Sequence, residues 1–221
     1  DLQSLTVHKL LYDKHSMDIM GSMTVVDWFK ACYDIADALH YIHEKGYLHC
    51  DIKTNNVLVS LHKNGYLIDF GKVKKIAYAS RKKYTKVYNY IAPEVLNGHP
   101  PSPASDVYSF GIVIKAIGET IGDNTLVELG QQSSSAIPAH RPSIMRLLST
   151  LNPYRGNTFD KGQKFFSWKW SLILNIYIPY VQSLKFLTKQ LQKSMIQISM
   201  IIARKVTAEK NVKKLSCTRE L

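Results

Sequence analysis

The sequence has few cysteines, no long hydrophobic run and no leader-like start. Three cysteines, Cys32, Cys50 and Cys217, are too few for a disulfide scaffold, and their spacing matches no zinc-binding pattern. A reducing, cytoplasmic compartment is therefore expected. No run reaches the roughly 18 uncharged apolar residues of a membrane-spanning helix. The chain starts at Asp1 without a basic and apolar leader, which favours a fragment or a processed end.

The composition is ordinary for a globular protein, whereas the charge is unevenly distributed. With 45% hydrophobic and 21% charged residues, wholesale disorder, collagen and low-complexity sequence are excluded. Residues 1–150 contain 16 basic and 14 acidic residues, whereas residues 151–221 contain 13 and 3. The C-terminal segment therefore contributes +10 of the net charge of +12. Its lysines are scattered, so we infer no firm nucleic-acid or membrane signal.

Hydrophobic periodicity predicts one long helix near the start of the chain. Apolar residues recur at three- and four-residue steps over Ser22–Gly46. Thr24 followed by Asp27 is a capping pattern, and Gly46 stands where a left-handed C-cap is expected. Further along, the apolar run Val107–Gly118 predicts a buried helix.

Shorter elements are predicted around this helix. We expect one or two helical turns in Ser4–Leu11 and a short helix over Ser143–Leu151. Thr120–Pro138, rich in Gly, Ser, Gln and Asn, is expected to be mostly loop, as is the basic, aperiodic segment Lys72–Val87. Short strands bounded by turn formers, with a hairpin turn at Asn64-Gly65, are predicted at Tyr47–His49, Val57–Ser60 and Tyr66–Ile68.

Two short motifs carry the chemistry of the sequence. Residues 49–56 read H-C-D-I-K-T-N-N, and residues 69–71 read D-F-G. Phosphoryl transfer needs an aligned nucleophile and metal ions that neutralise phosphate charge, rather than much covalent help from the protein. A carboxylate and a nearby lysine in a tight loop, with an amide and a second carboxylate on pairing strands, can supply both needs.

In their order and spacing, these motifs resemble the C-terminal lobe of the protein kinase family. Three further matches follow: A-P-E at 92–94, D-V-Y-S-F-G at 106–111 and H-R-P-S at 140–143. The resemblance implies an α+β fold, a mainly α-helical lobe whose short β-hairpins carry the catalytic and metal-binding loops. It covers residues 1 to about 151, so we predict a partial kinase domain at 1–151 and a basic tail of unknown structure at 152–221.

The family's residue roles are implied at matching positions. Asp51 resembles the catalytic base and Lys53 the phosphate-contacting lysine. Asn56 and Asp69 resemble the magnesium ligands, and Leu58 the residue that packs beneath adenine. The implied reaction is transfer of the γ-phosphate of ATP, with Mg²⁺, to Ser or Thr hydroxyls of a protein substrate. The loop lysine resembles serine/threonine kinases, and later motifs are closest to the tyrosine-kinase-like branch.

Other positions match the family's structural residues. Glu94 and Arg141 resemble a buried ion pair, Asp106 the carboxylate that anchors the catalytic loop, and His49 a packing residue behind Phe70. The histidines of the first helix, His40 and His43, are interpreted as surface or packing residues rather than metal ligands, because no third ligand is near.

The sequence also departs from the family pattern. It contains no glycine-rich loop and no V-A-I-K lysine, so we expect the N-terminal lobe to be absent and the chain alone to show negligible turnover. Cys50 replaces the usual arginine, either as a neutral filler or as a reactive thiol. Val87 replaces a threonine, and Thr85 lies two residues away. The interval from Gly111 to Arg141 is roughly half the usual length, which predicts a shortened or missing substrate-docking helix.

Two classes of function remain open. The first is a catalytic lobe of a serine/threonine kinase. The second is a non-catalytic, pseudokinase-like interaction module built on the same lobe. Intact Asp51, Asn56 and Asp69 favour the first class. The missing motifs, Val87 and the short interval favour the second.

Overall fold

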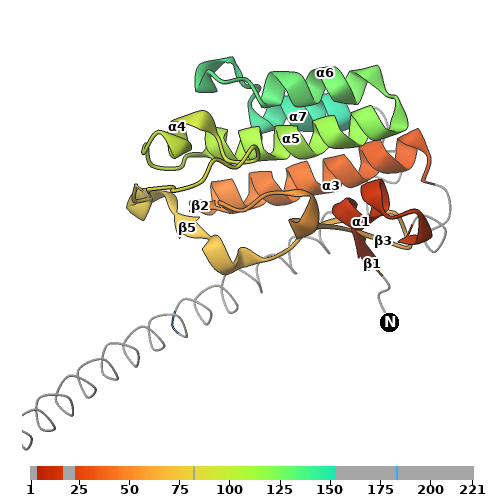
Figure 1. Ribbon diagram of the computed structural model, residues 1–221, viewed down its shortest axis with the longest axis horizontal. Helices are drawn as coiled ribbons and strands as arrows, with labels where there is room; N and C mark the ends of the chain where they lie inside the picture. The colour runs from red at the N-terminus through yellow and green to blue at the C-terminus, as the bar shows by residue number, and fades with distance from the viewer. Residues whose placement is uncertain (1–3, 17–22, 82, 153–182, 184–221) are drawn as a thin grey trace, which may run out of the picture. The chain divides into compact units, whose positions relative to one another are not determined.

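The computed structural model describes residues 4–16, 23–81, 83–152 and 183. The described residues up to 152 lie in one compact unit, residues 1–174. Two long helices, α3 (Val25–Glu44) and α5 (Pro103–Ile121), run through this unit, with the small strands on the α3 side (Figure 1). Almost all of the predicted tail at 152–221 lies outside the described residues.

Helix α3 begins and ends as the sequence predicts. The Asp27 main-chain N–H donates to Thr24 Oγ1 at 3.2 Å, and the Thr24 N–H donates to Asp27 Oδ2 at 2.9 Å. Gly46, one residue beyond the C-cap Lys45, has φ +78°, a conformation that glycine adopts without steric cost. One face of the helix is buried, including Phe29, and forms the centre of the core.

The strands form two small antiparallel sheets. The first has the order β1-β3-β4, with β1 at Ser4–Thr6, β3 at Val57–Ser60 and β4 at Gly65–Leu67. A Cβ atom on Gly65 would lie 2.3 Å from the main-chain oxygen of Ala31 in α3, so the hairpin packs directly on the helix. The expected β3–β4 hairpin is confirmed.

The N-terminal segment and the segment after residue 72 contain strands that were not predicted. Residues 4–6 form a strand rather than helix, and α1 (Val7–Tyr12) follows. β2 (Tyr47–Leu48) pairs with β5 (Lys74–Lys75), which lies inside the segment predicted as loop. The 3₁₀ turns η2 (Phe70–Lys72) and η3 (Ile76–Tyr78) flank β5. Pairing with a distant strand gives this aperiodic segment its local structure.

The prediction that Thr120–Pro138 is mostly loop is wrong. Helix α5 continues to Ile121, and α6 (Asn124–Ser133) follows with Asp123 as its N-cap. A Cβ atom on Gly130 would lie 2.5 Å from the Lys115 main-chain nitrogen. The small residues that suggested a loop therefore permit close packing of α6 on α5. The interval before Arg141, for which a shortened or missing helix was predicted, thus contains the ten-residue helix α6, packed on α5.

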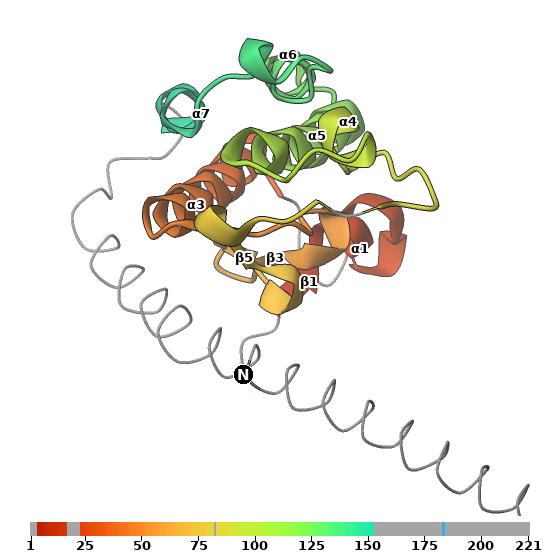
Figure 2. The same ribbon diagram turned by 90° about the vertical axis from the view of Figure 1, so that its left-hand side faces the viewer.

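The remaining helices are short. α4 (Pro93–Leu96) precedes α5. The 3₁₀ turn η4 (Pro138–His140) leads to α7 (Ile144–Leu151), which corresponds to the short helix predicted over Ser143–Leu151. α7 packs against α3, and α6 lies on the side of α5 away from the strands (Figure 2). No helix among the described residues is long and apolar enough to cross a membrane.

Candidate active site

The centre of the site is the loop between β2 and β3. The side chain of Asp51 is only 3% exposed, and the 3₁₀ turn η1 (Thr54–Asn56) brings Asn56 back towards it. Asn56 Nδ2 donates to the main-chain oxygen of Asp51 at 2.8 Å and to its Oδ2 atom at 3.1 Å. Two of the predicted site residues are thus in direct contact.

Two lysines hold the Asp51 carboxylate. Lys53 Nζ lies 3.2 Å from Oδ2, and Lys72 Nζ lies 2.8 Å from Oδ1. Burial acts to raise the pKa of Asp51, but hydrogen bonds from Lys72 and Lys53 outweigh it and lower the pKa. The sequence predicted Lys53 as a residue of this site. It did not predict Lys72, which is 52% exposed and was placed in a loop. The position of Lys72 directly after the D-F-G triplet was the signal that it could lie close to Asp51.

Asp69 is brought to the same place by the β3–β4 hairpin. The Ile68 N–H donates to the Asn56 main-chain oxygen at 3.0 Å, so residue 69 follows directly from that contact. Asp69 has φ +60°, and its Oδ1 atom accepts from the Gly71 N–H at 3.2 Å. The hairpin therefore brings together the two predicted magnesium ligands.

The donor set fits magnesium. Mg²⁺ is usually bound by one or two carboxylates together with substrate phosphates and water. Asp69 is exposed and offers a carboxylate, and the amide oxygen of Asn56 is a second hard ligand. The described residues contain no cluster of three or more His, Cys, Asp or Glu side chains that could hold a metal ion.

His49 connects the two loops from inside the protein. Its Nδ1 atom accepts from the Asp51 N–H at 3.3 Å, so the proton of the neutral ring lies on Nε2, which is 3.0 Å from the Ile68 oxygen. The ring packs edge-on against Phe70, as predicted. Burial lowers the pKa of His49, which favours the neutral form that both contacts require.

Asp106 anchors the loop at residues 49–56 from α5, as predicted. Its carboxylate is buried and accepts the main-chain N–H of His49 at 2.8 Å and that of Cys50 at 2.9 Å. His43 Nε2 lies 3.0 Å from Asp106 Oδ2. The interpretation of His43 as an ordinary surface or packing residue was therefore incomplete, because it is a partner of this carboxylate.

Cys50 occupies a strained position in the loop. Its φ of +62° is in the left-handed region, which a non-glycine residue adopts only when its surroundings hold it there. Here the bond from its N–H to Asp106 provides that hold. Burial raises the pKa of the Cys50 thiol to about 12, which supports a neutral filler over a reactive thiol.

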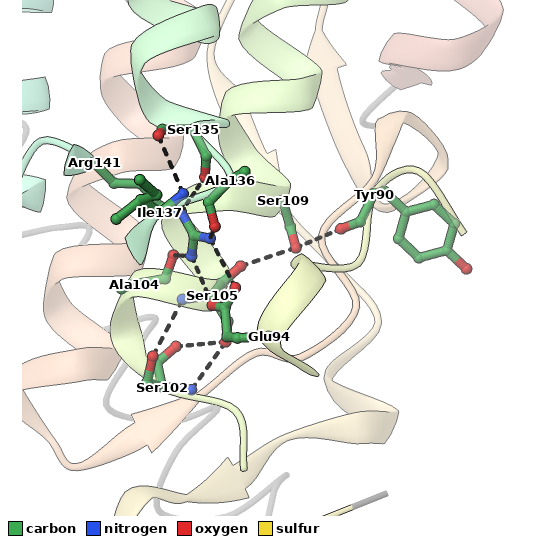
Figure 3. A network of polar contacts seen from close by, with 10 residues as sticks. All are labelled: Tyr90, Glu94, Ser102, Ala104, Ser105, Ser109, Ser135, Ala136, Ile137 and Arg141. Atoms are coloured by element: carbon green, nitrogen blue, oxygen red, sulfur yellow. Dashed lines mark hydrogen bonds and ion pairs between the residues drawn. The ribbon is translucent and has the colours of Figure 1, made fainter. Parts of the chain in front are cut away.

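A bidentate ion pair joins Glu94 in α4 to Arg141, which lies between η4 and α7 (Figure 3). Arg141 Nη1 and Nη2 lie 2.7 and 2.8 Å from the two carboxylate oxygens of Glu94. The other donors of Arg141 reach main-chain oxygens of Ala104, Ser135 and Ala136. All five N–H donors of the buried guanidinium are therefore satisfied, and the predicted ion pair is confirmed.

The two remaining predicted positions lie in different settings. Leu58 is half-buried in the middle strand β3, opposite Thr6 and Tyr66. Val87 is 86% exposed, whereas Thr85 lines a pocket next to Asp51. Thr85, and not Val87, therefore lines the same pocket as Asp51.

The chain is similar to several known protein kinases. The dual specificity testis-specific protein kinase 2 of Mus musculus is 41% identical over 92 residues, which cover 38% of this chain and 16% of that protein. The serine/threonine-protein kinase mos of Patiria pectinifera is 36% identical over 93 residues (38% and 26%). The mitogen-activated protein kinase kinase kinase dlk-1 of Caenorhabditis briggsae is 33% identical over 90 residues (40% and 10%).

These alignments span between 10% and 26% of the relatives' own lengths. The family model of the protein kinase domain, in contrast, matches residues 8–165, which is more than half of this sequence. That range contains the H-C-D-I-K-T-N-N motif, the D-F-G triplet and the Glu94–Arg141 pair. The chain belongs to the protein kinase domain family.

Proposed function

We propose that this site transfers the γ-phosphoryl group of ATP to a serine or threonine hydroxyl of a protein. The observation that supports this proposal is the convergence of Asp51, Asn56 and Asp69 around one hairpin. The bond between the γ-phosphorus and the oxygen that bridges to the β-phosphate breaks, and a bond to the hydroxyl oxygen forms. The hydroxyl proton passes to the Asp51 carboxylate, and ADP leaves.

The other residues act on charge and position. Asn56 and Asp69 would hold Mg²⁺, which neutralises charge on the phosphates when bound. The Lys53 ammonium, which reaches Asp51 Oδ2, extends into the same space and would contact the γ-phosphate. Leu58, half-buried on β3, offers an apolar surface for adenine. Asp106 positions the loop and does not touch the reacting atoms.

A non-catalytic interaction module is the second candidate. It is favoured by Lys72, because the two lysines together cover both oxygens of the Asp51 carboxylate. Both lysines lower the pKa of this carboxylate, which makes it a weaker base.

A radiolabel assay with [γ-³²P]ATP and Mg²⁺ separates the two candidates. The full chain is incubated with a serine- and threonine-containing peptide, next to the variants Asp51→Asn and Asp69→Asn. We expect slow transfer that falls at least about tenfold in both variants, since general-base catalysis contributes about 10²–10⁴-fold. Glu128→Gln, an exposed carboxylate on α6, is the matched control and should retain wild-type transfer. Equal transfer by wild type and Asp51→Asn would reject the catalytic proposal in favour of the module.

A further inference from the structure

The segment between the D-F-G triplet and Glu94 has a one-sided charge. Residues 72–93 contain seven basic residues and no aspartate or glutamate. This contrasts with residues 1–150 as a whole, where basic and acidic residues nearly balance. The basic residues are Lys72, Lys74, Lys75, Arg81, Lys82, Lys83 and Lys86.

Part of this charge faces a pocket next to the proposed catalytic base. The pocket has a volume of about 200 Å³, and Asp51 and Lys72 form one part of its lining. Lys83 and Thr85, from residues 72–93, line another part of the pocket together with tyrosine side chains. A substrate hydroxyl that approaches Asp51 from this side brings its neighbouring residues into contact with the two lysines.

The lining is positively charged overall. Asp51 is the one carboxylate among the described lining residues, and Lys53 and Lys72 already pair with it. Lys83, which is exposed, forms no ion pair with any other residue in the described part of the chain. An anion in the pocket can therefore bind the Lys83 ammonium. It can also bind the Lys72 ammonium, in competition with Asp51.

We propose that the protein segment phosphorylated here carries an anionic side chain beside its acceptor hydroxyl, and that this side chain binds Lys83 and Lys72. A carboxylate and a phosphorylated residue share the required chemistry. The inference rests on the proposed function, because it identifies the substrate class of the same site. It also links recognition to catalysis, since an anion that draws Lys72 from Asp51 Oδ1 frees that oxygen for the hydroxyl proton.

Binding is measured first, because it does not depend on turnover. Fluorescence anisotropy compares peptides of one length in which a serine is followed by Glu, phosphoserine or Gln, at low and high salt. We expect the two anionic peptides to bind the full chain about two- to fivefold more tightly than the Gln peptide, as for a partly exposed ion pair. High salt should reduce this preference.

Two single-lysine variants distinguish a pocket from diffuse attraction. Lys83→Ala removes a charge from the lining, and Lys86→Ala removes the same charge from an exposed position outside it. The preference for anionic peptides should disappear in Lys83→Ala and persist in Lys86→Ala. Equal loss in both variants, or equal binding of all three peptides by wild type, overturns the proposal. A preference for phosphoserine alone, or for Glu alone, supports it and identifies the anion.

Failure of the proposed function gives a different result. If the anionic peptides bind through Lys83 but Asp51-dependent transfer is absent, the recognition surface stands and catalysis does not. If transfer depends on Asp51 but is equally fast for Glu and Gln peptides, the kinase proposal stands and the substrate inference is wrong.

Discussion

The inner and outer sides of the candidate site differ in how their charges are held. On the inner side, Asp106 and Arg141 are buried, and each makes several hydrogen bonds to main-chain atoms. On the outer side, residues 72–93 are mostly exposed, and their charges are of one sign. The inner charges maintain the shape of the loops. On the outer side, Lys72 pairs with Asp51, whereas Lys83 forms no ion pair among the described residues.

This difference separates stability from recognition. A buried charge that loses its partner is costly, whereas an exposed charge loses little when its neighbour changes. Variants on the inner side should therefore affect unfolding, and variants on the outer side should affect binding and transfer.

The largest effect is expected from Arg141→Met. This change leaves the Glu94 carboxylate and three main-chain oxygens without their donor, and should lower the free energy of unfolding by about 3–5 kcal/mol. Urea titration followed by circular dichroism measures it. Lys115→Met, which breaks the exposed pair with Glu119, is the control and should cost at most about 1 kcal/mol. Similar losses in both variants would contradict the comparison.

A smaller loss of stability is expected from a substitution at the contact between α5 and α6. Gly130→Ala would place a Cβ atom 2.5 Å from the Lys115 nitrogen, so the helices must separate, at a cost of about 1–3 kcal/mol. Thermal unfolding tests this, with the exposed neighbour Gln131→Ala as control. If Gly130→Ala is as stable as Gln131→Ala, α6 does not pack on α5 as described.

Acid should lower the free energy of unfolding by protonating the Glu94 carboxylate, the partner of Arg141. Partial burial acts to raise its pKa, but the hydrogen bonds from Arg141 more than offset this, and the pKa is lowered. Its stabilising contribution is therefore complete above the unfolded pKa of about 4.3 and is lost as the pH falls through the lower folded value. Urea unfolding at several pH values between 6 and 3 should show a smaller decline in Arg141→Met than in wild type. An identical decline would mean that this pair does not titrate with folding.

The smallest effect is expected on the outer segment. Lys86→Ala removes an exposed charge with no ion pair among the described residues, and should change the free energy of unfolding by less than about 0.5 kcal/mol. The same urea titration checks it. A loss above 1 kcal/mol would show that this side of the site is also structural.

Much of the fold and site could be predicted because the signals are local or lie in short motifs. Periodicity and capping residues identified α3, and Asn64-Gly65 identified the hairpin. Motif order identified the Glu94–Arg141 pair. The helix α6 was missed because composition alone cannot distinguish a glycine in a loop from a glycine that permits close helix packing.

The sequence by itself identified the candidate site residues and the local elements that hold them, since capping, turns and periodicity act over a few residues. Only the tertiary structure decided which charges meet. His43 and Asp106 are 63 residues apart, and Lys72 and Asp51 are 21 residues apart. Such contacts depend on the path of the backbone between the two residues and on the packing of α3, α5 and the hairpin. Neither is encoded in the spacing of the contacting residues.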